Sequence, residues 1–304
     1  MPRRTPVADP SKIGEASEPS FVRLPDPAFM FSQRAERFRA VAEGNVLADY
    51  LRFVAFLVET QHAVIVSLSA APELDPAGLE LRLGAAMPPL TPELLHREPG
   101  FAETLDSLLR GFAPHSMPDP AAQAREQLLA QTPPQIITLA SSIFEGAFSA
   151  DRLAESLFVT AALQVHLARY ASRLPARRLQ PVGDGVCPAC GSAPVASLIV
   201  GWRGANRSRY CCCSLCGTMW NYVRIKCTSC GSTEGIAYSA VEQGLQDVAA
   251  ETCAKCRCYI KLLQQQRDPA LEPFADDIAS YGLDLLLREQ GFRRGGINPL
   301  FIAE

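Results

Sequence analysis

The stretch from Cys187 to Cys258 holds all eleven cysteines of the 304-residue chain, and eight of them form four Cys-x-x-Cys pairs. The pairs begin at Cys187, Cys213, Cys227 and Cys253, and the last two repeat the first two at an offset of 40 residues. In each repeat, 22 residues separate the second cysteine of one pair from the first cysteine of the next. This regular spacing indicates an internal duplication.

Each repeat has the composition of one complete metal site. A Cys-x-x-Cys turn brings two thiolates to one side of a metal ion, and a second pair on a returning hairpin completes a tetrahedron. The predicted ligands are Cys187, Cys190, Cys213 and Cys216 in the first site and Cys227, Cys230, Cys253 and Cys256 in the second. Glycine follows the second cysteine of the first three pairs, but Arg257 follows the fourth, which predicts a less regular loop there.

The alternative to a metal site is a set of disulfides, which is disfavoured because the chain carries no secretion signal. Four thiolates suit zinc and rubredoxin-type iron equally, so ligand identity leaves the metal open. A purely structural metal also stays open, because a small ribbon cannot build a sufficient core alone. By count, Cys211, Cys212 and Cys258 are spare. We expect Cys211 and Cys212 to be strand residues, with a redox-active thiol as the less favoured reading.

Charge argues against a nucleic-acid-binding protein. The whole chain has a net charge of −3 and a pI near 5.9. Residues 181–267 hold nine Lys or Arg and five Asp or Glu, and two divalent ions bound by eight thiolates would cancel that excess. The positive charge of this segment therefore balances the thiolates and does not indicate a DNA-binding face.

The remaining composition is that of a globular protein, with 48% hydrophobic residues and enough length for two domains. The most apolar stretch, Phe53 to Ala71, is interrupted by Glu59, Gln61 and His62. It is too polar to span a bilayer, so we expect no stable membrane insertion. The N-terminal residues have no apolar core typical of an export signal, which predicts a cytoplasmic protein.

Residues 1–20 are polar and contain proline, so we expect them to be disordered. Residues 21–180 show helical periodicity and few strand signals, which predicts an α-helical domain. Helices are expected over residues 26–41, 47–68, 101–111, 120–130, 134–148 and 151–172, with another beginning after Thr91. No catalytic signature is present, and His62, His96, His115 and His166 are scattered without ligand spacing. We therefore expect a protein that is not an enzyme.

The cysteine-rich segment, residues 181–267, is expected to be a small β-rich module. Short strands are predicted over Val195–Val200, Tyr222–Lys226 and Ile236–Val241. Trp220 and Tyr222 follow a Cys-x-x-Cys pair, so we expect them to cover the metal loop, although a partner-binding platform is the alternative.

Residues 268–304 are expected to form a C-terminal helix and tail. The helix has an apolar stripe at Phe274, Ile278, Tyr281 and Leu285 and ends at Gly291. Beyond it, Arg293 and Arg294 lie in a basic, glycine-rich loop. They are candidate partner-binding residues, with a tail tied to the surface as the alternative.

The order of these features resembles the formate dehydrogenase accessory protein family, FdhE. The resemblance covers both domains from about residue 21 to the C-terminus. It is carried by these stretches: FVRLPDPAFMFSQRAERF, LADYLRFVAFL, CPACGSAPVAS, CSLCGTMWNYVRIKC, CTSCGSTEGIAYSA, ETCAKCRCYIK and DDIASYGLDLLLREQGFRRGGINPL. Cys258 and the Cys211-Cys212 pair depart from the usual pattern of the family.

The resemblance implies a cytoplasmic, non-catalytic maturation factor that binds the catalytic subunit of respiratory formate dehydrogenase before its export. It also implies rubredoxin-like iron at the eight cysteines. The expected fold is a mostly α N-terminal helical bundle plus a small β-rich tandem rubredoxin-like or zinc-ribbon metal module, with a C-terminal helix. Self-association is a further expectation. The alternatives are a rubredoxin-like electron carrier and a zinc-ribbon nucleic-acid-binding protein.

Overall fold

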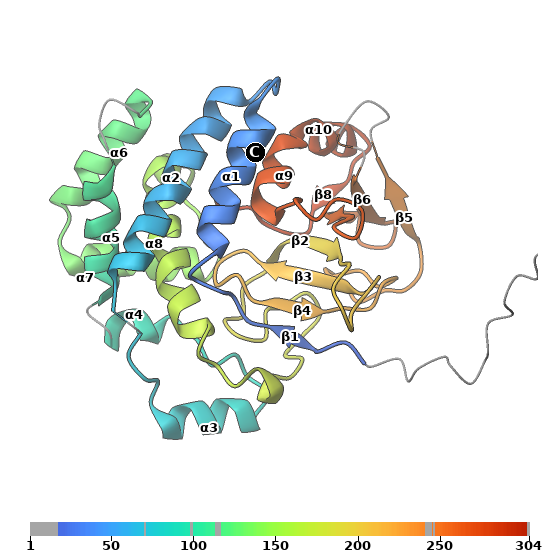
Figure 1. The fold of residues 1–304 in the computed structure, drawn as a ribbon, viewed down its shortest axis with the longest axis horizontal. Coiled ribbons are helices and arrows are strands. Elements are labelled where there is room, and N and C mark those ends of the chain that lie inside the picture. Colours follow the sequence, from blue (N-terminus) through green and yellow to red (C-terminus); the bar gives the residue numbers. More distant parts are fainter. Residues whose placement is uncertain are drawn as a thin grey trace, which may run out of the picture.

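A computed structural model describes residues 18–69, 71–97, 100–112, 117–240, 245 and 247–302. Of the predicted disordered segment 1–20, residues 1–17 lie outside this range, as do His115 and Val241, the last residue of the predicted strand Ile236–Val241. Figure 1 shows helices gathered on one side of the molecule and a twisted sheet on the other, with two C-terminal helices above the sheet. The predicted fold class, a helical N-terminal part followed by a β-rich cysteine module and a helical C-terminal part, is confirmed.

The N-terminal part is helical, as predicted. Its helices are α1 (Met30–Ala42), α2 (Ala48–Ser67), α3 (Pro76–Gly84), α4 (Glu93–Arg97), α5 (Gly100–Gly111), α6 (Asp119–Ala130), α7 (Pro133–Phe144) and α8 (Leu153–Ala171). Helix α3 was not expected from the sequence. It starts with a standard signal, because the Asp75 carboxylate accepts a hydrogen bond from the Gly78 N–H and Pro76 occupies the first turn.

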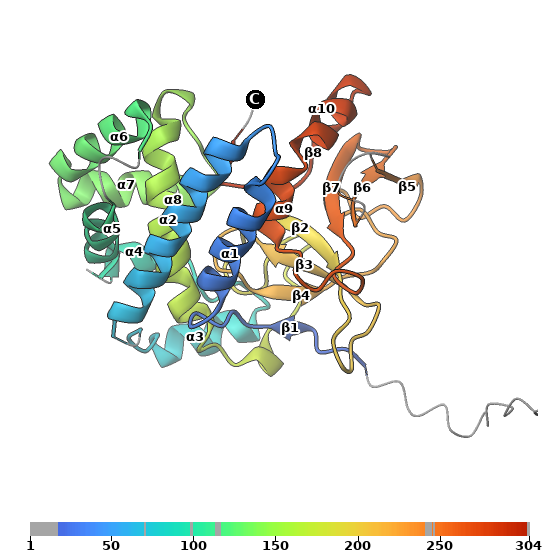
Figure 2. The same ribbon diagram turned by 45° about the horizontal axis from the view of Figure 1, so that its top comes forward.

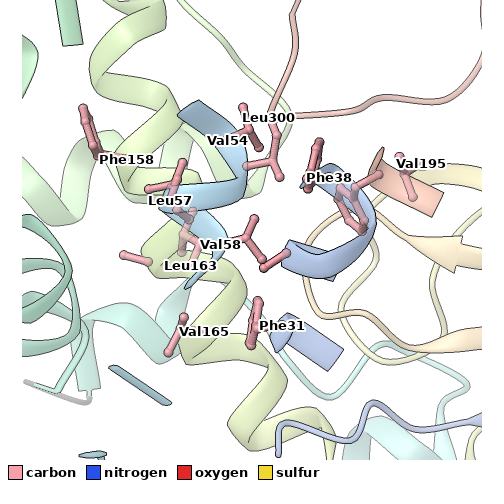
Figure 3. Packing of buried hydrophobic residues seen from close by; sticks show 14 of the residues in the cluster. Phe31, Phe38, Val54, Leu57, Val58, Phe158, Leu163, Val165, Val195 and Leu300 are labelled. Carbon is pink, nitrogen blue, oxygen red and sulfur yellow. The ribbon is translucent and has the colours of Figure 1, made fainter. Parts of the chain in front are cut away.

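Helix α8 is the centre of the bundle, because α2, α5, α6 and α7 all pack against it. Most of its residues from Phe158 to Ala171 are buried, so it carries no polar face toward solvent over that stretch. A second set of contacts joins the bundle to the sheet. The largest buried cluster includes Phe38 of α1, Val54 of α2 and Leu163 of α8 together with Val195 of the sheet and Leu300 near the C-terminus, as Figure 3 shows.

The cysteine module forms one continuous sheet. Its strands are β2 (Pro194–Ile199), β3 (Arg209–Cys213), β4 (Met219–Asn221), β5 (Ile236–Ser239), β6 (Val248–Cys253) and β7 (Cys258–Leu263), with β1 (Val22–Arg23) and β8 (Arg293–Arg294) added from the two ends of the described chain. The order along the main path is β1-β4-β3-β2-β7-β6-β5, and β8 pairs with β7. The first repeat supplies β2 to β4 and the second supplies β5 to β7, so the two repeats meet where β2 and β7 pair in parallel.

Two strand predictions change. Residues 222–226, predicted as a strand for their β-branched residues, form a turn, and the strand of that region is Met219–Asn221. The side chains of Val223 and Ile225 are exposed, so their β-branched composition reflects no sheet packing. The short strand β1 was not predicted, because its two residues become a strand only by pairing with Trp220 and Met219.

The predicted C-terminal helix is two helices, α9 (Pro273–Ala279) and α10 (Tyr281–Glu289), which break at Ser280. The break changes the buried face: Phe274 and Ile278 are buried as predicted, but Leu285 is exposed, and Leu283 and Leu287 are buried instead. Helix α9 lies between α1 and the sheet, as both Figure 1 and Figure 2 show. Among the described residues, no helix is both long and apolar enough to cross a membrane.

Candidate metal centre

The first predicted site comes together at the bundle-facing end of the first repeat. The Sγ atoms of Cys187, Cys190, Cys213 and Cys216 all lie within 4.8 Å of one another. The Cys187–Cys216 pair is separated by 3.6 Å and the Cys190–Cys213 pair by 3.3 Å. All four side chains are buried.

The second predicted site has the same arrangement. Its Cys227 and Cys256 sulfurs lie 3.6 Å apart and its Cys230 and Cys253 sulfurs 3.8 Å apart. A tetrahedron with metal–sulfur bonds of about 2.3 Å has sulfur–sulfur edges of about 3.8 Å. The spacing of both groups therefore fits one tetrahedral thiolate-bound ion each, and all eight predicted ligands fall into the two groups that can hold a metal.

Three of the four cysteine turns share one hydrogen-bond pattern. The N–H of the residue after the second cysteine donates to the carbonyl of the first cysteine: Gly191 to Cys187 at 2.9 Å, Gly231 to Cys227 at 3.0 Å and Arg257 to Cys253 at 2.9 Å. This closure requires a left-handed residue, and Gly191, Gly217 and Gly231 all have φ between 70° and 79°.

Arg257 adopts the same conformation, with φ of 58°, so the prediction of a less regular fourth loop is wrong. A left-handed conformation costs a residue with a Cβ about 1 kcal/mol or more. Two contacts offset that cost. The Arg257 guanidinium donates to the carbonyl of Gln290 and lies 4.0 Å from the centre of the Phe292 ring.

The protein does not stabilise thiolate equally on all the sulfurs. Burial and the neighbouring thiols raise the pKa of Cys213, although the backbone N–H groups of Leu215 and Cys216 both donate to its Sγ at 3.4 Å. At the second site, burial opposes ionisation of Cys253. The N–H groups of Cys256 and Lys255 nevertheless outweigh burial and lower the pKa of the Cys253 thiol to about 7. Thiolate is the form that binds metal, so these donors favour metal binding at neutral pH.

The first site is enclosed by the helical bundle. Its cysteines belong to a buried cluster that includes Leu167 and Tyr170 of α8, Leu90 and Trp220. The Gln164 side chain of α8 donates to the carbonyl of Ser214, between the two cysteines of a pair, at 2.9 Å. Trp220 is buried against this site, as predicted for a covering residue, and is not an exposed platform.

The chain also packs directly on the turns of this site. A Cβ placed on Gly217 would lie 2.6 Å from the terminal methyl group of Met30. The backbone N–H of Leu90 donates to the carbonyl of Ala189 at 2.9 Å. Both cysteine pairs of the first site are therefore held by segments from the N-terminal part.

The second site lies at the surface. Cys230 is exposed and Cys256 half-buried, whereas Cys227 and Cys253 are buried. The exposed turn that carries Val223 and Ile225 lies near this site. The Tyr222 hydroxyl, which precedes the turn, donates to the Cys227 carbonyl. Within the described part of the chain, the four cysteines of this site belong to neither of the hydrophobic clusters that contain helices of the bundle.

The three spare cysteines lie outside both groups. Cys211 and Cys212 are buried strand residues of β3, as expected. Burial raises the pKa of both thiols, so they stay protonated at neutral pH, which disfavours the redox-active reading. Cys258 begins β7 and is half-buried, and by the 40-residue offset it takes the place of Thr218.

The two candidate partner-binding arginines differ. Arg293 is exposed and pairs in β8 with Cys258 of β7, which places it beside the second site. The Arg294 guanidinium instead forms ion pairs with Asp277 and Asp284, and the bond to Asp284 measures 3.2 Å. Arg293 is therefore the member of the pair whose side chain is left toward solvent.

Buried ion pairs that sequence reasoning missed join the two repeats to each other and the second repeat to the C-terminal helices. Arg209 of β3 pairs with Glu251 of β6 at 2.9 Å, and both are almost completely buried. Lys261 of β7 pairs with Asp277 of α9 and Asp284 of α10. The partners are far apart in the sequence, so no local pattern could have found them.

Comparisons with known proteins agree along the whole described chain. Residues 19–184 match the family model "FdhE, N-terminal", residues 186–224 "FdhE, central domain" and residues 225–301 "FdhE, C-terminal domain". A protein of Rhizobium meliloti called "Protein FdhE homolog" is 40% identical over 298 residues, 97% of each chain. "Protein FdhE" of Salmonella paratyphi B is 35% identical over 90% of this chain and 89% of its own.

A solved structure is similar over nearly the same length. The crystal structure titled "The crystal structure of the FdhE protein from Pseudomonas aeruginosa" superposes with a TM-score of 0.83 at 35% sequence identity. The match covers 92% of this chain and 98% of that chain.

Proposed function

Because the chain belongs to the FdhE family, we propose that it is a non-catalytic maturation factor for respiratory formate dehydrogenase that binds the enzyme's catalytic subunit in the cytoplasm. The family name supports the formate dehydrogenase link. The two four-cysteine groups support the presence of two metal ions. No arrangement of nucleophile, base and acid stands out in the sequence, which is why we assign no catalysis.

The observation that carries the proposal is the exposure of the second site. Near the second site, the turn that follows Tyr222, whose hydroxyl donates to the Cys227 carbonyl, and strand β5 expose three large apolar side chains: Val223 (59%), Ile225 (57%) and Tyr238 (51%). The Tyr238 hydroxyl donates to the Arg224 carbonyl at 3.2 Å, so strand β5 and the turn form one surface. An exposed apolar patch often marks a surface that binds another protein, and this one lies near an exposed metal site. We call these three residues the docking patch.

The proposed metal is rubredoxin-type iron, with zinc as the alternative. Iron in four thiolates supplies one-electron exchange, whereas zinc supplies only a structural cross-link. The chain's own contribution is to hold the sulfurs at tetrahedral spacing, to lower the pKa of the Cys253 thiol to about 7, and to expose Cys230 toward the client. Arg293, beside the same site, is proposed to contact the client as well. Arg294 is proposed to support that contact by fixing β8 through its internal ion pairs.

Metal analysis and an absorption spectrum of protein purified without oxygen test the metal assignment. Two irons per chain with visible sulfur-to-iron bands support it. Two zincs without such bands make both sites structural and move the client-binding role wholly to the protein surface.

A binding measurement with the purified catalytic subunit tests the docking patch. The double substitution V223D and I225D places charge on the patch and should weaken binding at least about tenfold. V66D is the matched control, because Val66 is equally exposed but lies on helix α2. A strain that lacks the protein yet retains full formate dehydrogenase activity would contradict the maturation role itself.

A rubredoxin-like electron carrier is the second candidate, because the exposed Cys230 favours electron exchange at the second site. It predicts reversible reduction by a reductase with no client present. Reduction that occurs only when the client is present would favour maturation instead.

A further inference from the structure

A cleft of about 540 Å³ lies away from the second site, between helix α1 and residues 265–273. Strands β3 and β4 contribute Cys212 and Met219 to its lining, and Trp202 closes one side. The segments that line it can be followed in Figure 2, where α1 runs above β1 and the sheet. Gly217, which follows a ligand of the first metal site, also lines the cleft.

The cleft extends along helix α1. Its lining follows α1 from Met30 to Ala40, over nearly three turns. At about 1.5 Å per residue this is about 15 Å, the length of roughly four to five residues of extended chain. A volume of about 540 Å³ is common for small-molecule pockets, but the span along α1 also admits an extended segment of polypeptide.

Two buried polar atoms of the lining have no hydrogen-bond partner within the described part of the chain: Nη1 of Arg34, a donor, and Oε1 of Gln265, an acceptor. Arg34 is only 3% exposed. The other atoms of these groups are engaged, since Arg34 Nε donates to Glu272 at 2.7 Å and Gln265 Nε2 to the Leu271 carbonyl at 3.1 Å. Buried polar atoms are rarely left unpaired, so this donor and this acceptor call for a ligand.

A peptide unit is the simplest complement, because it offers one carbonyl acceptor and one N–H donor. Charge adds little selectivity. The exposed Asp26 and Glu36 lie on the lining with Arg23, whose guanidinium is 4.2 Å from the centre of the Trp202 ring. The rest of the lining mixes apolar side chains, such as Met30 and Leu271, with the ion-paired Arg37 and Glu272.

We propose that this cleft binds an extended, apolar segment of the formate dehydrogenase catalytic subunit. A backbone carbonyl of the segment accepts from Arg34 Nη1, and a backbone N–H donates to Gln265 Oε1. Both atoms are shielded from solvent in the free chain, so the two side chains turn toward the cleft as the segment enters. The assignment rests on the proposed function and adds a second contact region to the docking patch.

Binding of two probes tests the proposal: the intact catalytic subunit and short synthetic peptides that tile its sequence. A40W fills the cleft from α1, and Q265L removes the unpaired acceptor together with the Nε2 bond to the Leu271 carbonyl, at a similar side-chain size. A63W is the control, because Ala63 is an exposed helical alanine that does not line the cleft. Circular dichroism verifies that each variant is folded.

We expect at least one apolar peptide to bind the wild-type chain, and A40W and Q265L to weaken that binding about tenfold or more while A63W does not. Affinity should change little with salt, since the lining carries both charges. Unchanged peptide and subunit affinity in both cleft variants overturns the cleft assignment but leaves the maturation role standing. Failure of the wild-type chain to bind the intact subunit overturns the maturation role, and the cleft assignment with it.

Discussion

The two four-cysteine sites repeat each other in sequence and in backbone geometry, yet they differ in their surroundings. All four cysteines of the first site are buried, and α8, the loop with Leu90 and Met30 of α1 pack against them. The second site exposes Cys230 and leaves Cys256 half-buried. The duplication therefore produced two similar sites, and the N-terminal helices covered only one of them.

The buried site and the exposed site suit two different roles of a metal ion. A covered site contributes to folding, because its ion holds together segments that also contact the bundle. An exposed site can exchange its ion or meet a partner while the fold stays intact. We infer that the first site stabilises the chain and that the second serves the client.

The largest expected effect comes from removing equivalent ligands. Cys190 and Cys230 correspond by the 40-residue offset, but only Cys190 is buried. Because C190S leaves buried thiolates without their ion, it should lower the free energy of unfolding by about 3–5 kcal/mol. C230S should lower it by about 1 kcal/mol or less, since water solvates the remaining groups. Denaturant unfolding with metal analysis makes the measurement, and equal losses would contradict the comparison.

Acid should weaken the bundle that holds the first site. His166 of α8 is buried beside Phe101 and Tyr170, and burial lowers its pKa from 6.5 to about 4. The unfolded chain then binds the extra proton, so stability is lost as pH falls from about 6.5 to 4, by about 3 kcal/mol. H166F should remove this part of the pH dependence. The measurement is the free energy of unfolding of both proteins across this pH range. If it changes with pH at the same slope in both, His166 does not contribute.

A smaller effect should follow loss of the contact between α8 and the first site. Q164L removes the hydrogen bond to the Ser214 carbonyl and leaves a buried acceptor unpaired, at about 1–3 kcal/mol. Release of metal from the first site should become faster, and the second site serves as the control in the same molecule. A variant that speeds release from both sites alike would mean that the contact stabilises the whole fold and not the first site.

The smallest effect concerns the fourth cysteine turn. R257G relieves the left-handed strain but removes the contacts with Gln290 and Phe292. The two changes should nearly cancel, so we expect stability to change by less than about 1 kcal/mol. A thermal melt is sufficient, and a clear loss of stability would show that the Arg257 contacts outweigh the strain.

The sequence predicts the site better than the arrangement around it. The spacing of eight cysteines identifies both four-cysteine groups, because metal ligation constrains local residue types. Exposure of Cys230 could not be predicted, since it depends on which face of the sheet the bundle covers. The Arg209–Glu251 and Lys261–Asp277 pairs could not be predicted for the same reason, because each joins residues that only the fold brings together.

Helices were predicted well because their signals are local. The start of α3 does have a local signal, since Pro76 in the first turn follows the capping residue Asp75. The strand predicted at residues 222–226 failed because β-branched residues also occur in exposed turns. Neither the parallel pairing of β2 with β7 nor the two-residue strand β1 leaves a local pattern.

Chelator-induced metal release from the intact protein tests the central claim most directly. With two ions bound per chain, a chromogenic chelator should remove one ion quickly from the exposed second site. The other should leave the covered first site at least about tenfold more slowly and only as the chain unfolds. C230S should abolish the fast phase alone. Release of both ions in one phase, or loss of the slow phase in C230S, would contradict the division between a structural and a client-facing site.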